Sequence, residues 1–133
     1  LYDCAISING VSDLPQFLDY VSDRFGTDSQ AVRYWNRSIS GSISERASMD
    51  ALTSASPSRQ AAAVTIPVLL LHGQDDTVVP FTQSRRMSDS LQRSGGNVEL
   101  IELPGGDHWL WEYQSRLRVL QEIERFLSMH LEE

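Results

Sequence analysis

Three short apolar runs along the chain predict three β-strands. They cover residues 4–8, 68–71 and 98–103, and turn-forming Asn, Gly or Pro residues lie beside each of them. The first two runs are almost continuously apolar, which is typical of strands buried on both faces of a parallel sheet. The third carries Glu99 and Glu102, so we expect it at a wetter edge of the sheet.

Apolar residues at helical spacing predict amphipathic helices between and after these strands. One helix starts after residue 13, with Asp13 as its N-cap and Pro15 in its first turn, and a second covers residues 30–37. Residues 38–65 are rich in Ser, Ala and Thr and predict a loop with one short helix, whereas residues 81–94 predict a full helix that ends at two glycines. A long C-terminal helix is expected to bury Leu117, Leu120, Ile123 and Leu127.

Strands that alternate with helices in this order indicate an α/β fold with a parallel sheet and right-handed crossovers. The 133 residues, 41% of them hydrophobic, suffice for one domain with a modest core. A formal net charge of −7 argues against a nucleic-acid partner, and no apolar run approaches the ~20 residues of a membrane helix. Cys4 is the only cysteine and cannot form an internal disulfide, and the three His residues lack Cys or Glu at metal-ligand spacing.

The second and third strands are each followed by residues that can carry acid–base chemistry. Asp75 and Asp76 follow the second strand, and His108 follows the third. Catalytic groups of open α/β sheets lie beyond the carboxyl ends of the strands, and an acid followed by a His is the order of the last two members of the α/β-hydrolase triad. A loop acid or a loop His alone is usually a solvated or structural residue. Their order and their places after strands therefore favour a functional pair, although the sequence contains no G-x-S-x-G serine motif.

Residues 72–80, His-Gly-Gln-Asp-Asp-Thr-Val-Val-Pro, resemble the His-Gly-x-x-Asp-x-x-Val-Pro loop of the prolyl oligopeptidase family of serine peptidases, which includes acylaminoacyl and dipeptidyl peptidases. Gly106-Asp107-His108 is similar to that family's histidine loop, which more often reads Gly-His-Gly. Residues 2–13 look like the strand after its nucleophile helix. The resemblance spans nearly the whole chain. It implies that residues 1–133 are the C-terminal portion of a single α/β-hydrolase domain whose nucleophile elbow would lie before Leu1.

The resemblance also implies roles for individual residues. Asp76 would be the triad acid and Asp75 a turn residue, His108 the general base, and His72 a packed, hydrogen-bonded side chain. Asp107 could cap the loop or be solvated, and Trp109 and Trp111 could shield the histidine or pack on the last helix. The residues expected to line the substrate pocket, with ordinary core packing as the alternative, are Val11, Leu14 and Phe17.

The function implied is that of a serine peptidase that cleaves short peptides through an acyl-enzyme, without a cofactor. The 133-residue chain would be inactive alone because it lacks the nucleophilic serine. Dienelactone hydrolases and carboxylesterases carry similar loops, so an esterase on the same fold is an alternative, as is a non-catalytic interaction domain. Without the nucleophile strand, the sheet edge near Cys4 and Ile8 would be open, which predicts a homo-oligomer through that edge.

Overall fold

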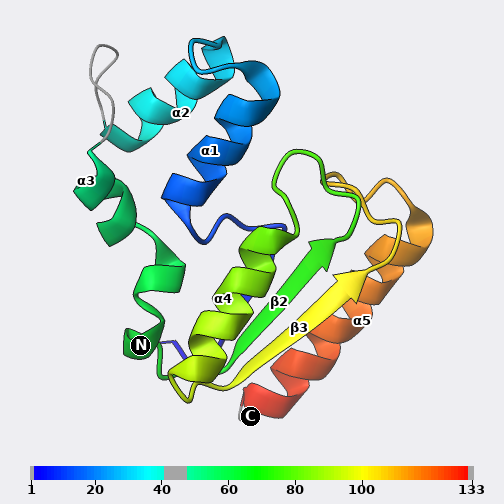
Figure 1. Cartoon of the computed structure of the whole chain (residues 1–133). Helices are drawn as coiled ribbons and strands as arrows, with labels where there is room; N and C mark the ends of the chain where they lie inside the picture. Colours follow the sequence, from blue (N-terminus) through cyan, green and yellow to red (C-terminus); the bar gives the residue numbers. More distant parts are fainter. Residues whose placement is uncertain (1, 41–47, 132–133) are drawn as a thin grey trace.

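Three parallel strands form the centre of the molecule. The computed structural model describes residues 2–40 and 48–131 (Figure 1). Strands β1 (Ala5–Ile8), β2 (Val68–Gly73) and β3 (Val98–Leu103) lie side by side in the order β1-β2-β3. In this register Leu71 pairs with Ile8 on one side and with Ile101 on the other. The predicted parallel α/β sheet is therefore confirmed.

Helices cover both faces of this sheet because the side chains of the buried strand β2 alternate between the faces. Helix α4 (Thr82–Arg93) packs through Met87 and Leu91 on Val68 and Leu70. Helix α5 (Tyr113–His130) covers the opposite face, where Val119 and Phe126 meet Leu69, Leu71 and Leu103. Figure 1 shows α4 and α5 on either side of the strands, with the loops after β2 and β3 emerging at the same end.

The segment between β1 and β2 is helical and packs beside α4. It comprises α1 (Leu14–Phe25), α2 (Gln30–Ser40), α3 (Met49–Ser54) and two 3-10 turns, at Pro57–Arg59 and Ala61–Ala63. Asp13 caps α1 as predicted, since its carboxylate accepts a hydrogen bond from the Gln16 N–H at 3.2 Å and pairs with Arg59 at 3.0 Å. The short helix expected within residues 38–65 is present as α3, and residues 41–47 lie outside the described part of the chain.

Strand β1 differs from the expectation of a buried strand. It lies at the edge of the sheet, Ala5 is exposed, and Ile8 is 42% exposed. Among the described residues, no strand pairs with its other edge, so its outward backbone groups lack a ladder partner within this sheet. The wetter edge predicted for the strand with Glu99 and Glu102 is confirmed, since β3 forms the other edge.

The buried stripe of α5 also differs from the sequence prediction. The buried residues of α5 are Ser115, Val119, Glu122 and Phe126, and of the predicted stripe only Ile123 packs on the core cluster of Val119 and Phe126. Leu120, expected in the core, is 65% exposed, and Leu117 and Leu127 are only partly buried. At 100° per residue the leucine stripe lies roughly a third of a turn from the sheet-facing stripe. Glu122 can be buried because Arg118 and Arg125 form ion pairs with it at 2.7 and 2.8 Å.

Candidate active site

The acid loop, residues 73–80, leaves the carboxyl end of β2 and holds a buried carboxylate. The Oδ1 atom of Asp76 accepts hydrogen bonds from the backbone N–H groups of Val78 and Val79, both at 2.8 Å. Asp75 is exposed, and its backbone N–H donates to the carbonyl of Gly106 at 3.0 Å. Only Asp76 therefore presents its carboxylate inward, and Asp75 is the turn residue of the pair.

The histidine loop, residues 104–112, leaves the carboxyl end of β3 and brings His108 onto this carboxylate. His108 Nδ1 lies 2.8 Å from Asp76 Oδ2, although 32 positions separate the residues. A carboxylate only accepts, so Nδ1 carries the proton of this contact, and in the neutral ring Nε2 is then the nitrogen with the free lone pair. The side chain of His108 is 23% exposed, so this second nitrogen belongs to a ring that solvent reaches. An orienting carboxylate and an accessible ring nitrogen are what a general base requires.

His72, at the end of β2, lies next to the same carboxylate but has a different environment. Its Nε2 donates to the carbonyl of Val79 at 2.9 Å and lies 3.5 Å from Asp76 Oδ2, while Nδ1 accepts from the Ser84 hydroxyl at 2.7 Å. Both ring nitrogens are thus occupied, and the side chain is fully buried. Burial, the largest cause, lowers the pKa of His72 below its ordinary value of 6.5. His72 is a packed, neutral residue that supports the acid loop.

The acid and histidine loops touch along their backbones. Gln74 and Asp75 donate backbone hydrogen bonds to Leu103 and Gly106, each at 3.0 Å. Gly73 is required at this crossing, because a Cβ there would lie 2.2 Å from the carbonyl oxygen of Gly106. The two loops therefore form one unit at the end of the sheet.

Asn9, at the end of β1, is a third contributor that the sequence did not reveal. Its side-chain amide accepts a hydrogen bond from Gly73 N–H and donates to the carbonyls of Asp107 and His108. In the sequence, Asn9 and Gly10 indicate only a turn. No local pattern could have identified these contacts, because their partners lie 64 to 99 positions away.

One aromatic side chain, Trp109, contacts the histidine. Trp109 contacts the His108 ring edge-to-face, with the ring centroids 5.0 Å apart. Trp109 and Trp111 are both exposed, so neither is packed into the core beside the last helix. Asp107 Oδ1 accepts a hydrogen bond from the backbone N–H of Trp111 at 3.1 Å. Of the two alternatives for Asp107, the structure therefore favours the loop cap.

The three residues predicted to line a substrate pocket lie in or just before α1 and differ in burial. Phe17 is buried in a cluster with Val21, Val32 and Val79. Val11 packs on that cluster and also lines a cavity of about 220 Å³ beside β1, whereas Leu14 is partly buried at the start of α1. The hydroxyl of Tyr20 donates to the carbonyl of Thr77 at 2.7 Å, so α1 is attached directly to the acid loop. The substrate role of these residues stays a prediction.

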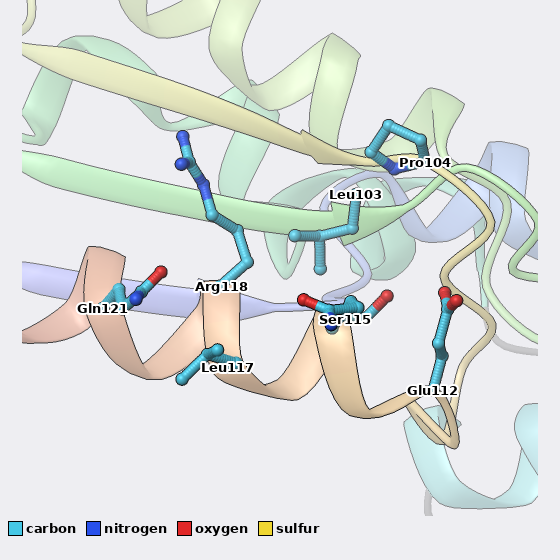
Figure 2. A pocket seen from close by; sticks show the side chains of 8 residues that line it. Leu103, Pro104, Glu112, Ser115, Leu117, Arg118 and Gln121 are labelled. Carbon is cyan, nitrogen blue, oxygen red and sulfur yellow. The ribbon is translucent and has the colours of Figure 1, made fainter.

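A second cavity, of about 340 Å³, lies between the end of β3 and the start of α5 (Figure 2). Leu103 points towards α5 in this view, and Arg118 reaches from α5 towards β3. Neither Asp76 nor His108 lines this cavity. Within residues 2–40 and 48–131, no three His, Cys, Asp or Glu side chains gather as possible metal ligands. No helix in the same ranges is long and apolar enough to cross a membrane.

Comparison with known proteins shows which family the chain belongs to. The uncharacterized peptidase YuxL of Bacillus subtilis (strain 168) is 26% identical over 129 residues, which are 95% of this chain and 17% of YuxL. The bifunctional esterase/perhydrolase DCH of Acinetobacter calcoaceticus is 47% identical over 45 residues, 34% of this chain and 15% of that protein. The acylaminoacyl peptidase of Pyrococcus horikoshii has the same fold, with a TM-score of 0.79 at 21% identity over 100% of this chain and 20% of its own.

The present chain thus spans less than a quarter of the length of each of these relatives. The model of the prolyl oligopeptidase family matches residues 1–133, which is the entire chain. The α/β fold and the family resemblance inferred from the sequence are therefore confirmed. The chain belongs to the prolyl oligopeptidase family of serine peptidases.

Proposed function

We propose that this chain supplies the acid and the histidine of a serine peptidase that hydrolyses short peptides through an acyl-enzyme. The observation that carries the proposal is the 2.8 Å contact between His108 Nδ1 and Asp76 Oδ2 at the ends of neighbouring parallel strands. Asp76 is buried and held by two backbone N–H groups, whereas His108 is partly exposed. This difference suits an orienting acid and a proton-transferring base.

The proposed reaction follows from this arrangement. As the serine oxygen bonds to the scissile carbonyl carbon, His108 Nε2 takes the hydroxyl proton and then gives it to the leaving amine. In the second half, the same nitrogen removes a proton from water as the water oxygen bonds to the acyl carbon, and returns it to the serine oxygen as the acyl–oxygen bond breaks. Asp76 holds the ring in this tautomer and stabilises the imidazolium that forms in between. We place the serine in a part of the protein outside these 133 residues, since the chain has no G-x-S-x-G motif.

The substrate side chain before the scissile bond is proposed to lie near the start of α1. Val11 packs on the cluster that contains Val79, three residues after Asp76, so this region is continuous with the acid loop. Phe17 would support the pocket from the core, because it is buried against Trp35 with the ring centroids 4.9 Å apart. Leu14, partly buried, would contribute at the rim.

Hydrolysis of peptide p-nitroanilides by the full protein, of which these 133 residues form a part, tests the proposal. We expect turnover there, blocked by a serine-directed fluorophosphonate, and none from the 133-residue chain alone. The chain alone would lack the covalent step and the oxyanion hole, one donor of which is worth about 10²–10³ in rate. Turnover and fluorophosphonate labelling of the chain alone would instead place the nucleophile among its own serines.

An esterase is a second candidate, favoured by the 47% identity with the esterase/perhydrolase DCH over 45 residues. An ester bond needs less help for its leaving group than an amide, so an esterase would cleave p-nitrophenyl esters and leave peptide anilides intact. A peptidase would cleave both. Comparison of kcat/KM for an acyl group presented as ester and as anilide separates the two functions.

We further propose that the 133-residue chain associates with itself through the open edge of β1, near Cys4 and Ile8. Backbone N–H and C=O groups on this edge can pair with a second strand, and the adjacent cavity of about 220 Å³ adds apolar surface. Light scattering at micromolar concentration should then detect a dimer or a larger species.

The variant Ile8→Lys places a charge on this edge at a position that is 42% exposed, so we expect it to shift the chain towards monomer. Leu120→Lys is the matched control, because Leu120 is also exposed but lies on α5. A wild-type monomer whose amides at residues 4–8 are protected from hydrogen exchange would contradict the proposal.

A further inference from the structure

We infer that Asn9 is a positioning residue that holds His108 in register with Asp76. The inference rests on the proposed function, since it concerns the same acid–histidine pair. Asn9 lies at the carboxyl end of β1 and is only 6% exposed. Asn9 is not part of the acid–histidine motif, which lies in the loops after β2 and β3.

The side-chain amide of Asn9 uses both of its ends. Its Oδ1 accepts a hydrogen bond from the buried Gly73 N–H at 2.9 Å, at the point where β2 becomes the acid loop. Its Nδ2 donates to the carbonyl of His108 at 3.0 Å and, less closely, to the carbonyl of Asp107 at 3.4 Å. One planar amide therefore links the ends of β1 and β2 to the backbone of the histidine itself.

The backbone of Asn9 is held independently of these side-chain contacts. Its N–H donates to the Leu71 carbonyl at 2.9 Å, which continues the β1–β2 ladder. Its φ of 50° lies in the left-handed region, which Asn adopts more readily than most residues. The site requires a side chain that both donates and accepts hydrogen bonds, on a residue that tolerates this φ, and Asn meets both requirements.

The contact acts close to the reacting group. The other backbone anchors of the histidine loop, from Gln74 and Asp75, bind Leu103 and Gly106, which precede the histidine. Asn9 alone among these anchors binds the carbonyl of His108 itself. Loss of its donor would free the backbone from which the imidazole reaches Asp76, and a displacement of about 1 Å can cost 10²-fold in rate.

The variant Asn9→Asp isolates this donor. It keeps an oxygen for the Gly73 N–H and tolerates the same φ, but it replaces Nδ2 with an oxygen that repels the Asp107 and His108 carbonyls. In the full protein we expect kcat for a peptide anilide to fall about 10- to 100-fold while KM stays close to the wild-type value. Asn97→Asp is the matched control, since Asn97 is exposed at the opposite end of the sheet.

A second measurement does not depend on activity. In the 133-residue chain, the Nδ1 proton that His108 shares with Asp76 should give a low-field NMR signal that Asn97→Asp retains and Asn9→Asp loses or broadens. If the wild-type protein cleaves no peptide, the proposed function fails, and this signal still tests the role of Asn9. Asn9→Gly, which removes the amide and accepts the positive φ, should give the same loss if the Asp variant does not fold. Wild-type kcat together with an unchanged ring signal in either folded variant would overturn the inference.

Discussion

The acid loop and the histidine loop end neighbouring strands, but they are held in opposite ways. The Asp76 carboxylate is held by its own loop, since it binds the backbone N–H groups of Val78 and Val79, and the neighbouring His72 binds the Val79 carbonyl. The rest of the acid loop is also bound from outside, since Tyr20 donates to the Thr77 carbonyl. The histidine loop is held largely from outside, by Asn9 and by the backbone of Asp75. The residues that fix the acid are therefore local in sequence, and those that fix the histidine are distant.

This difference fits the separate roles that we propose for Asp76, the orienting acid, and His108, the base. An orienting acid should not move during a reaction, and a loop whose own backbone saturates one carboxylate oxygen provides that rigidity. A base must reach a substrate, so its loop is more exposed, and its accuracy depends on contacts from other strands. Substitutions inside the acid loop should therefore lower kcat directly, whereas substitutions at the distant anchors should lower kcat by displacing His108.

The largest expected loss of kcat follows substitution of Asp76 or His108. In the full protein, Asp76→Asn and His108→Ala should each lower kcat by roughly four to six decades. Asp75→Asn is the matched control within the same turn and should retain most activity, because the Asp75 side chain is exposed. Steady-state rates on a peptide anilide test this. Near-normal rates for Asp76→Asn beside a collapse for Asp75→Asn would reverse the assignment.

The contact between the two loops is tested by Gly73→Ala. The new Cβ would lie 2.2 Å from the Gly106 oxygen, so the loops must separate, at a cost of about 1–3 kcal/mol or more in unfolding free energy. Because the histidine loop moves, kcat should fall as well. Urea unfolding and steady-state kinetics measure the two effects.

Gly26→Ala is the control for this change. Gly26 has a φ of 89° and a ψ of 148°, a region that only glycine adopts readily, and a Cβ at this position would meet nothing within 4 Å, so Ala there should cost about 1–3 kcal/mol through backbone strain alone. Its kcat should remain normal. Equal loss of kcat in both variants would mean that general destabilisation, and not the loop contact, lowers the rate.

The support of the acid loop by His72 predicts a pH dependence of stability. Burial lowers the pKa of His72 below 6.5, with smaller opposing effects from the Val79 carbonyl and Asp76 and a lowering effect from His108. The unfolded chain therefore binds a proton below about pH 6.5 that the folded chain rejects, and this contribution to stability is lost as pH falls. One group can contribute a slope of at most about 1.4 kcal/mol per pH unit.

The variant His72→Gln, whose amide can still donate to Val79 and accept from Ser84, should flatten this slope. All other side chains are the same in the two proteins, so the difference between the two curves isolates His72. Urea unfolding between pH 7.5 and 5 provides the measurement. Parallel curves for the two proteins would show that His72 does not cause the acid sensitivity.

The same division between local and distant contacts explains what the sequence could predict. The apolar run in β2, the Asp13 cap of α1 and the nine-residue string around Asp76 are local patterns, and each predicts its local structure correctly. The packed state of His72 agrees with the expectation drawn from the resemblance to the family's acid loop.

What the sequence could not predict depends on distant partners. Asn9 contacts residues 64 to 99 positions away, and Gln83 binds the backbone of Ser12 and Asp13 across 71 and 70 positions. The predicted buried stripe of α5 is wrong for Leu120, which is exposed, whereas Ile123 packs on the core as predicted and Leu117 and Leu127 are half-buried. Glu122 looks like a surface residue until Arg118 and Arg125 are known to bind it.

The smallest expected effect concerns a side-chain hydrogen bond within the histidine loop. Asp107 Oδ1 accepts the Trp111 N–H at 3.1 Å, whereas its backbone carbonyl accepts from Leu110 and Asn9. Asp107→Asn keeps a side-chain acceptor and should behave as wild type. Asp107→Ala removes it, and since the bond is exposed we expect a loss of no more than about 1 kcal/mol in unfolding free energy. The kcat of Asp107→Ala should fall less than that of Asn9→Asp, because the carbonyl bonds from Asn9 remain. If Asp107→Ala instead lowers kcat as far as Asn9→Asp does, the histidine loop is held from within after all, and the contrast between the two loops disappears.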